Sequence, residues 1–306
     1  MGKLEHDAQE KLRDNLEGQQ DNLIEVKKVS KKFTGFTLQE ISFNLKKGDI
    51  MGFIGPNGAG KTTTIKLMMN LLKKDGGEIR IFNQDHLRHE RSIKERIGFV
   101  YDNQEFYDEL KAREVEKIIA PFYRSWDSKV YTRYLKDFEL PQSKKVKDFS
   151  KGMKMKFSLA VALFHQAELL IMDEPTSGLD PVFRQEFLDL IRDFMDERKG
   201  VLFSTHITSD LDKIADYITF INQGRIVLSS SKEKILEDYG LVKGEKKYLR
   251  EELCPHLIGL REGNFGFEAL TAEAEYLRRN YPEIMVERPT LEEIMLYLVR
   301  GAKKDV

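Results

Sequence analysis

The stretch Gly55-Pro56-Asn57-Gly58-Ala59-Gly60-Lys61-Thr62-Thr63 decides how the rest of the chain is interpreted. It fits the pattern Gly-x-x-x-x-Gly-Lys-[Ser/Thr] of the phosphate-binding loop. The apolar run at 50–54 before it predicts a buried strand. A helical pattern follows it, with one apolar face made of Ile65, Met68, Met69 and Leu72. Strand, loop and helix in this order form the context that the motif needs.

Each part of this loop has a chemical reason to hold phosphates. Its glycines let the backbone curl, so that successive N–H groups point at phosphate oxygens. The helix after the loop adds its positive N-terminal end. Lys61 can reach the β- and γ-phosphates, and the Thr62 hydroxyl can ligate Mg²⁺. An ordinary glycine-rich turn is the alternative, but the four fixed positions in this context favour a nucleoside triphosphate site.

The composition fits a globular protein with a sizeable core. The chain has 306 residues, 41% hydrophobic and 33% charged, which is enough for one large domain or two modest ones. Lys and Arg number 50 against 51 Asp and Glu, so the charge balance does not suggest a nucleic-acid binder. The single Cys254 excludes an internal disulfide framework and fits a reducing compartment. Neither a signal peptide nor an apolar run of the ~18–20 residues that span a bilayer is evident, so we expect a cytosolic protein.

The segments before the phosphate loop predict an extension and then a sheet. Residues 1–22 are mostly polar, and we expect a solvated extension, with a short amphipathic helix as the alternative. Alternating patterns from Leu23 onward predict an antiparallel sheet at the front of a nucleotide domain. Phe33 and Phe36 flank Gly35 on the link between two of its strands. An aromatic face there could stack on a purine, and simple core packing is the alternative for each ring.

Two helical patterns follow in the middle of the chain. Residues 108–140 predict a helical insertion, whose aromatic cluster at 122–126 is either satellite core or a patch for a partner. A second helix opens after Ser150, which is a good N-cap residue. The Ser and Gly at its start could bind phosphate, but composition alone indicates only a cap.

The next strand ends in two acids. Leu169-Leu170-Ile171-Met172-Asp173-Glu174 predicts a buried parallel strand that delivers carboxylates at its C-terminal edge. In a phosphate-loop protein such an Asp helps to hold Mg²⁺, and the adjacent Glu is placed to polarise water. A strand that simply ends in charged residues is the alternative.

The remainder of the chain predicts more of the same domain and then a different one. Asp180 and Pro181 open a helix that we expect to run to Gly200. His206 follows a further buried strand at the sheet edge where ligands bind, so site and structural roles both stay open.

From about residue 230 the pattern weakens. We expect a small accessory domain without a catalytic constellation, ending in a capped amphipathic helix at 289–298.

Taken in order, these stretches resemble the motifs of an ATP-binding cassette. Walker A is 55–63, the signature is Phe149-Ser150-Lys151-Gly152-Met153, and Walker B is 169–173 followed by Glu174. The loop Ser177-Gly178-Leu179-Asp180 and the switch His206 complete the set. Over about residues 23–230 the chain resembles the nucleotide-binding subunit of a bacterial ABC transporter. Its tail is similar to the YtrB-like branch, whose subunits pair with separate membrane proteins.

The resemblance implies an α/β fold, the P-loop NTPase ABC cassette. Such a cassette has a RecA-like core, an antiparallel β subdomain and a helical subdomain, here at about residues 103–167. We therefore expect an N-terminal extension at 1–22, an ABC ATP-binding domain at 23–230 and a C-terminal accessory domain at 231–306.

The resemblance also implies a role for each motif residue. Phe33 would stack on adenine, Glu174 would be the general base, and Lys61 and His206 would contact the γ-phosphate. Thr62 and Asp173 would bind Mg²⁺. Ser150 and Gly152 would contact ATP bound to the opposite subunit. The other residues expected around the nucleotide are Gly55, Asn57, Gly58, Ala59, Gly60, Thr63, Asp102 and Asp180.

The sequence departs from the family pattern in two places. In the signature, Phe149, Lys151 and Met153 replace the usual Leu, Gly and Gln. The phosphate-contacting Ser150 and Gly152 are kept, so we expect function to survive. Where the family has a Gln that ligates Mg²⁺, this chain has Asp102, with Gln104 two residues on. We expect one of these two to substitute for that Gln.

The resemblance thus implies an ATP hydrolase with Mg²⁺ as cofactor. Its partners would be a second ATP-binding subunit, in a homodimer or a heterodimer, and membrane-spanning transporter subunits at the inner face of the cell membrane. An export or cell-envelope role is favoured, and no nucleic-acid partner is expected. A soluble ABC ATPase acting on a ribosome or nucleic-acid complex, a metabolic kinase and a non-hydrolysing regulatory module are the alternatives.

Overall fold

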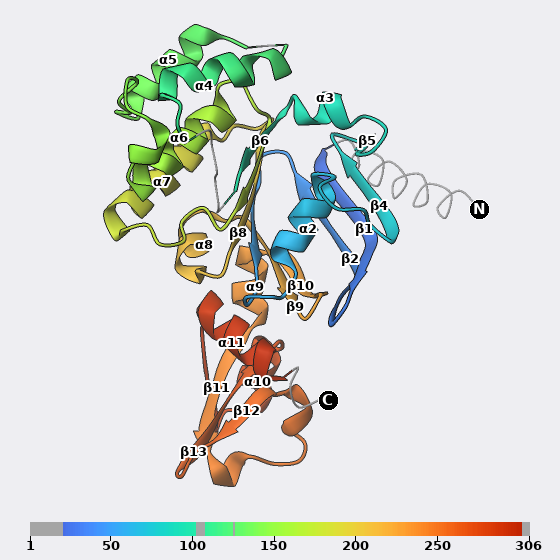
Figure 1. Cartoon of the computed structure of the whole chain (residues 1–306). Helices are drawn as coiled ribbons and strands as arrows, with labels where there is room; N and C mark the ends of the chain where they lie inside the picture. Colours follow the sequence, from blue (N-terminus) through green and yellow to red (C-terminus); the bar gives the residue numbers. More distant parts are fainter. Residues whose placement is uncertain (1–20, 102–107, 125, 302–306) are drawn as a thin grey trace, which may run out of the picture.

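The computed structural model describes residues 21–101, 108–124 and 126–301 (Figure 1). The predictions for Asp102 and Gln104, and nearly all of the predicted extension, lie outside these residues. Within the described ranges, no helix combines the length and the apolar character required to cross a bilayer.

A six-stranded sheet forms the centre of the larger part of the molecule, in the order β10-β9-β3-β8-β7-β6. All of its neighbouring strands are parallel except the β9–β10 hairpin. The parallel strands are buried almost throughout, as expected for a sheet covered on both faces. Their carboxyl ends therefore bring the segments after β3, β7 and β8 to one edge. The strands are β3 (Ile50–Ile54), β6 (Ile97–Val100), β7 (Leu169–Asp173), β8 (Gly200–Thr205), β9 (Tyr217–Asn222) and β10 (Arg225–Ser231).

A second, antiparallel sheet in the order β2-β1-β4-β5 packs beside the first one, as the alternating pattern predicted. Its inward side chains share one hydrophobic core with β3 and with α2, the helix that follows the phosphate loop. Phe43 of this sheet contacts Phe53 of β3, with ring centroids 5.3 Å apart. The elements are β1 (Asn22–Phe33), β2 (Phe36–Lys46), β4 (Gly76–Ile81), β5 (Gln84–Asp85) and α2 (Lys61–Met68).

Helices form the upper part of the molecule in Figure 1. The predicted insertion contains α4 and α5, held together by the Tyr131 hydroxyl, which donates to the Ala112 carbonyl at 2.7 Å. The Trp126 ring contacts that of Phe164 in a tilted arrangement, with centroids 3.8 Å apart, and so packs against the core, whereas Phe122 is 70% exposed. These helices are α3 (Glu90–Lys94), α4 (Ala112–Ile119), α5 (Ser128–Asp137), α6 (Lys151–Leu163) and α7 (Pro181–Phe194).

The predicted end of the helix after Pro181 was wrong. α7 ends at Phe194, because Met195 has extended backbone angles, and Gly200 instead begins β8. The Lys199 ammonium donates to the Phe194 carbonyl at 2.9 Å and so satisfies one of the last helical carbonyls.

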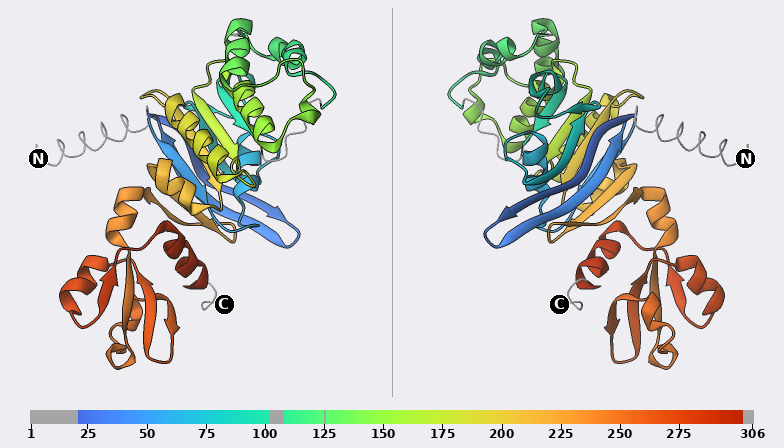
Figure 2. Two further views of the ribbon diagram at one scale, coloured as in Figure 1. Left: turned by 90° about the vertical axis from the view of Figure 1, so that its left-hand side faces the viewer. Right: turned by 90° about the vertical axis from the view of Figure 1, so that its right-hand side faces the viewer.

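The C-terminal region forms its own antiparallel sheet, drawn in orange to red in Figure 2. Its strand order is β12-β13-β11-β14. The predicted final helix is present, and Thr290 and Glu293 cap it reciprocally. The elements are α9 (Lys232–Asp238), β11 (Gly240–Glu245), β12 (Ile258–Glu262), β13 (Gly266–Thr271), α10 (Ala274–Asn280), β14 (Met285–Glu287) and α11 (Leu291–Gly301).

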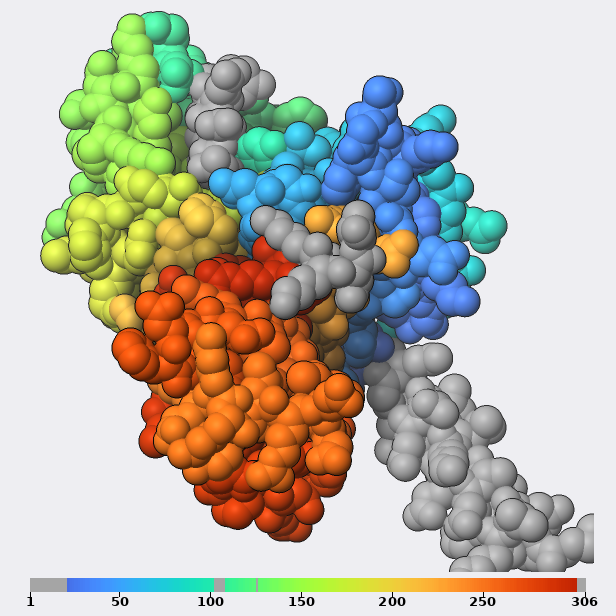
Figure 3. Space-filling model, turned by 90° about the horizontal axis from the view of Figure 1, so that it is seen from below, coloured from blue at the N-terminus to red at the C-terminus, as the bar shows by residue number. Residues whose placement is uncertain are grey.

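The C-terminal region and the cassette share a hydrophobic core. α11 packs against α8 (Thr208–Ile214), the short helix that begins just after His206. Buried Ile294 and Leu298 of α11 belong to the same apolar cluster as Leu211 and Ile214 of α8. Figure 3 shows α11, in red, between the orange remainder of the region and the cassette.

Candidate nucleotide site

The phosphate loop joins β3 to α2, as the strand-loop-helix pattern predicted. Gly60 has a φ of 116°, and a Cβ there would come within 2.9 Å of a Leu38 methyl group. A Cβ on Gly55 would lie 2.2 Å from the Ile221 carbonyl oxygen. Glycine is therefore required at both positions, by backbone conformation at one and by close approach at both.

A cavity of about 550 Å³ opens over this loop. Among the lining residues, Glu174 comes from the end of β7, beyond the loop itself. The residues that line it are Gly35, Phe36, Asn57, Gly58, Gly60, Lys61, Thr62, Thr63 and Glu174. The structure thus brings seven of the predicted site residues into one cavity: Asn57, Gly58, Gly60, Lys61, Thr62, Thr63 and Glu174.

Phe36 lines this cavity, but Phe33 does not. The Phe33 ring lies 6.3 Å from that of Phe36, between centroids, and is 38% exposed. Phe36 also lies under Gly60, where an added Cβ would approach its ring to 3.1 Å. The stacking role expected for Phe33 stays a prediction, and Phe36 is a second aromatic candidate that its place beside Gly35 had already suggested.

Lys61 is buried, and its ammonium is held by oxygens. It donates to the Gly55 carbonyl at 2.7 Å and pairs with Glu174 Oε1 at 3.1 Å. A buried cation needs such partners, because removing it from water without them costs several kcal/mol. These two contacts therefore hold the Lys61 ammonium against the phosphate loop.

Asp173 is buried at the end of β7 and accepts two hydroxyl hydrogen bonds. Thr62 Oγ1 donates to one carboxylate oxygen at 2.7 Å, and Ser204 Oγ donates to the other at 2.9 Å. Burial raises the pKa of the Asp173 carboxyl above its ordinary value, against the opposing effect of these hydrogen bonds. Sequence reasoning missed Ser204, although a polar residue at the end of a buried strand was the available signal.

Glu174 lies between Lys61 and the predicted switch histidine. His206 Nδ1 donates to Glu174 Oε2 at 2.7 Å, and the His206 backbone N–H lies 3.3 Å from the same oxygen. Glu174 has a φ of 50°, a left-handed conformation that a non-glycine residue rarely adopts. Such strain is typical of functional positions, where surrounding contacts hold the residue in place.

A buried hydrogen bond ties the segment after Glu174 to α8. The Thr176 hydroxyl donates to Asp210 Oδ2 at 2.6 Å, and both side chains are buried. Arg184 Nε of α7 lies 3.8 Å from the other Asp210 oxygen. Because α8 begins two residues after His206, this contact couples the position of the histidine loop to that of the acidic strand end.

Ser150, Gly152 and Asp180 lie outside the cavity. Ser150 caps α6, as predicted, and its hydroxyl accepts from the Met153 N–H at 3.2 Å. Asp180 caps α7 in the same way, and the two helix starts touch, since a Cβ on Gly152 would lie 3.2 Å from the Phe183 ring. One chain therefore does not bring these residues to its own phosphate loop.

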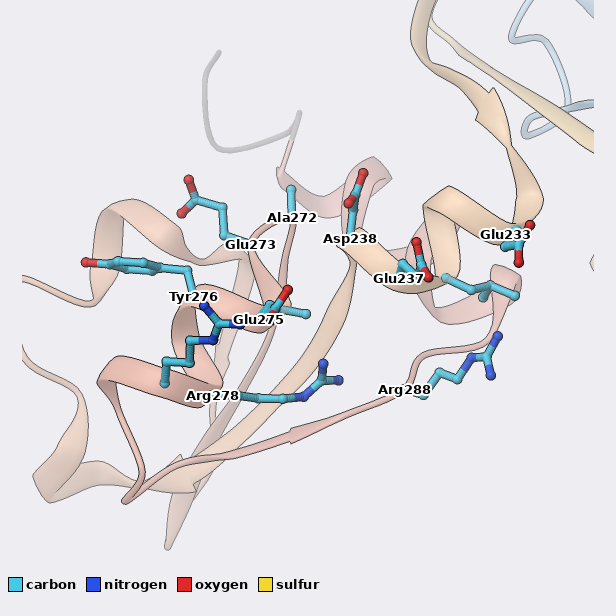
Figure 4. A pocket seen from close by; sticks show the side chains of 12 residues that line it. Glu233, Glu237, Asp238, Ala272, Glu273, Glu275, Tyr276, Arg278 and Arg288 are labelled. Atoms are coloured by element: carbon cyan, nitrogen blue, oxygen red, sulfur yellow. Dashed lines mark hydrogen bonds and ion pairs between the residues drawn. The ribbon is translucent and has the colours of Figure 1, made fainter.

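A groove of about 940 Å³ lies in the C-terminal region, between α9, α10 and Arg288 (Figure 4). It is lined by acidic and basic side chains, among them Glu237 and Arg278. It shares no residue with the cavity over the phosphate loop. Nothing in its lining resembles the nucleotide site.

Comparisons with known proteins agree with this geometry. Residues 38–177 match the family model described as "ABC transporter". The bacitracin transport ATP-binding protein BcrA of Bacillus licheniformis is 37% identical over 253 residues, which cover 81% of each chain. The ABC transporter ATP-binding protein YtrB of Bacillus subtilis is 26% identical over 92% of this chain and all of its own length.

A solved structure of an "ATP binding subunit of ABC transporter" superposes with a TM-score of 0.65 at 28% identity, over 70% of this chain and 92% of its own. The predicted fold class and the predicted family are thus confirmed, whereas the YtrB-like branch stays a prediction because BcrA is the more identical of the two relatives. The chain belongs to the ABC transporter family, as an ATP-binding subunit that hydrolyses ATP to drive transport.

Proposed function

We propose that the chain works in a dimer of ATP-binding subunits, with each ATP held between the cavity of one subunit and residues 150–152 of the other. The support is the separation described above: the cavity contains the phosphate loop, while Ser150 and Gly152 lie at another surface. All motifs for two such sites occur in this one sequence, so a second copy of the chain is a sufficient partner.

The contacts of Glu174 carry the proposed chemistry. Its carboxylate accepts the proton of the attacking water, while Lys61 and His206, which flank it at 3.1 and 2.7 Å, neutralise charge on the γ-phosphate. His206 is 42% exposed, so its ring can turn from Glu174 towards a phosphate. Once ATP is bound, Lys61 exchanges its contact with Glu174 for phosphate oxygens, which frees the base.

Thr62 and Asp173 are the residues that would hold Mg²⁺. Their hydroxyl and carboxylate oxygens are the hard donors that this ion prefers, and they already lie 2.7 Å apart. One protein carboxylate is enough, because Mg²⁺ in nucleotide sites is completed by phosphate oxygens and water. The ion would neutralise charge that develops on the phosphates. Whether Asp102 takes part lies outside the described residues.

The proposed setting is the inner face of the cell membrane, where separate membrane-spanning subunits move the substrate. Membership of the ABC transporter family supports this arrangement. An export or cell-envelope role is the direction that we propose, supported by the relative named for bacitracin transport. Closure of the dimer on ATP and its reopening after hydrolysis would drive the membrane subunits.

Glu174→Gln tests the proposed chemistry. The amide keeps the shape but cannot take a proton, so we expect ATP hydrolysis to fall by roughly 10²-fold or more. The variant should still bind ATP and should accumulate as an ATP-dependent dimer, measured by size-exclusion chromatography with light scattering. Glu197→Gln, at an exposed position outside the site, is the control. Normal turnover of Glu174→Gln would remove Glu174 as the base, and a monomer at saturating ATP would remove the dimer.

A further inference from the structure

The signature segment, residues 149–153, departs from its family at three positions, and only one of them faces solvent. Phe149 is buried and packs against Phe157, with ring centroids 5.9 Å apart. Met153 is partly buried against the same core. Lys151 is exposed. Two of the departures therefore adjust packing, while the third places a charge on the surface that carries Ser150 and Gly152.

Lys151 differs from the other lysines of α6 in its partners. Lys154 pairs with Asp108 at 3.5 Å, and Lys156 pairs with Glu186 at 3.0 Å. No carboxylate in the described ranges pairs with Lys151, and the first turn of α6 contains no acidic residue. A lysine at this end of a helix is also disfavoured by the helix dipole. Its charge is thus uncompensated by any carboxylate of residues 21–101, 108–124 and 126–301.

The Lys151 side chain extends over the loop at 177–180. An added Cβ on Gly178 would come within 2.5 Å of its ammonium nitrogen, and Gly178 has a φ of 67°. The ammonium therefore lies between the Ser150 cap and the start of α7, on the surface that the proposed dimer turns towards the opposite phosphate loop.

We propose that Lys151 binds the γ-phosphate of ATP held by the opposite subunit, together with Ser150 and Gly152. This inference rests on the proposed dimer. A glycine at this position offers only backbone, whereas an ammonium adds a charge-assisted hydrogen bond to a phosphate oxygen. The contact exists only across the interface, so it strengthens closure on ATP and leaves nucleotide binding by a single subunit unchanged. Because ADP lacks the γ-phosphate, the same contact favours the triphosphate.

The test uses Lys151→Met and Lys151→Arg in the Glu174→Gln background, with ATP-dependent dimerisation as the readout. Methionine keeps the length of the side chain and its packing on Gly178 but removes the charge. We expect the ATP concentration for half-maximal dimerisation to rise about 10-fold or more with Met and to stay near the parent value with Arg. The dependence of dimerisation on salt should also weaken with Met, because one charge contact is lost.

The controls separate this contact from a structural effect. Lys136→Met removes an exposed lysine of α5 and should leave dimerisation unchanged. Binding of ADP should be the same for Lys151→Met and its parent, and the melting temperature should be equal or slightly higher, because a cation is removed from the start of a helix. If the Glu174→Gln parent dimerises with ATP, and Lys151→Met reaches half-maximal dimerisation at the same ATP concentration, the inference about Lys151 is wrong and the proposed dimer stands. If the Glu174→Gln parent does not dimerise, the proposed function fails and the inference with it.

Discussion

The two halves of the proposed active site are built in opposite ways. The hydrolytic half, made of Lys61, Thr62, Asp173, Glu174 and His206, is largely closed upon itself by ion pairs and hydrogen bonds. The signature segment packs Phe149 and Met153 on the core and uses Ser150 to cap its own helix, while its exposed Lys151 pairs with no carboxylate among the described residues. The hydrolytic half is thus organised before any partner arrives, whereas the signature segment has interactions left to make.

The two halves also differ in their effect on the stability of the folded chain. The hydrolytic half contains a buried carboxylate of raised pKa and a glutamate in left-handed conformation, and both features destabilise the folded chain. The Ser150 cap of the signature segment, by contrast, stabilises its helix. Substitutions that relieve these features of the hydrolytic half should therefore lower activity while raising stability. Substitutions that remove the cap of the signature segment should lower stability.

Asp173→Asn should show the largest effect. We expect ATP hydrolysis to fall by roughly 10³-fold, because the carboxylate that would hold Mg²⁺ is lost. The nucleotide-free variant should nevertheless melt at a higher temperature than the parent at neutral pH. The amide is uncharged and still accepts the Thr62 hydrogen bond, so the cost of burying an ionised carboxylate disappears.

The pH dependence of this gain in melting temperature follows from the direction of the pKa shift. The folded chain holds a proton on Asp173 more tightly than the unfolded chain does. The stability that this carboxyl contributes is complete below its unfolded pKa and is lost as the pH rises through the folded value. The difference between Asp173→Asn and the parent should therefore shrink as the pH is lowered. Asp193→Asn, on the exposed face of α7, is the control, and a lower melting temperature for Asp173→Asn would contradict the argument.

Mixing two inactive variants tests whether the halves come from different chains. Gly152→Asp places a carboxylate in the signature segment, where it repels phosphate but suits the first turn of a helix. Asp173→Asn and Gly152→Asp should each be inactive alone. After mixing in equal amounts, up to about a quarter of the parent activity should return, because half of the dimers would contain one intact site.

Activity in the mixture that only equals the sum of the two separate variants would show that each chain supplies a whole site to itself. Asp173→Asn should keep the parent melting temperature or exceed it, whereas Gly152→Asp should lower it slightly, because its Cβ crowds the Phe183 ring at 3.2 Å. A cooperative melting transition in both variants excludes a loss of folding as the reason for their inactivity.

Removal of the Asp180 cap should have a smaller effect than either Asp173→Asn or Gly152→Asp. Its carboxylate accepts from the Val182 and Phe183 N–H groups at 3.1 and 3.0 Å. Asp180→Ala removes this cap and should cost about 1 kcal/mol of stability, a drop of a few degrees in melting temperature. Asp180→Asn keeps a capping oxygen and should restore the melting temperature. If it also restores hydrolysis, Asp180 is a cap only; if it does not, its charge serves the interface between subunits.

The parts of the site that the sequence predicted are those encoded within a few residues. The phosphate loop, the two caps at Ser150 and Asp180, and the acidic strand end follow from local conformational preferences and from strand periodicity. The contact of Glu174 with both Lys61 and His206 does not, because three separate strand ends meet there. Ser204, too, gains its role only from the strand beside it.

The C-terminal sheet shows why the remaining fold could not be predicted. Its strands contain glycines where an alternating pattern would need side chains. A Cβ on Gly244 of β11 would lie 2.7 Å from the Phe267 ring of β13. Glycine is therefore required there by a neighbouring strand, which the local sequence pattern does not reveal. Glycine within a strand weakens the periodic signal, and the prediction stopped at an accessory region for that reason.

The packing of α11 on α8 limits how this chain can be recombined with its relatives. A fusion point near residue 230 would separate Ile294 and Leu298 from the cluster that includes Leu211, and would leave that face of α8 in water. A chimera that exchanges the C-terminal region must therefore exchange α8 with it. Asp210 of α8 accepts a hydrogen bond from Thr176, beside the acidic strand end. The C-terminal region therefore cannot be exchanged independently of the ATP-binding domain.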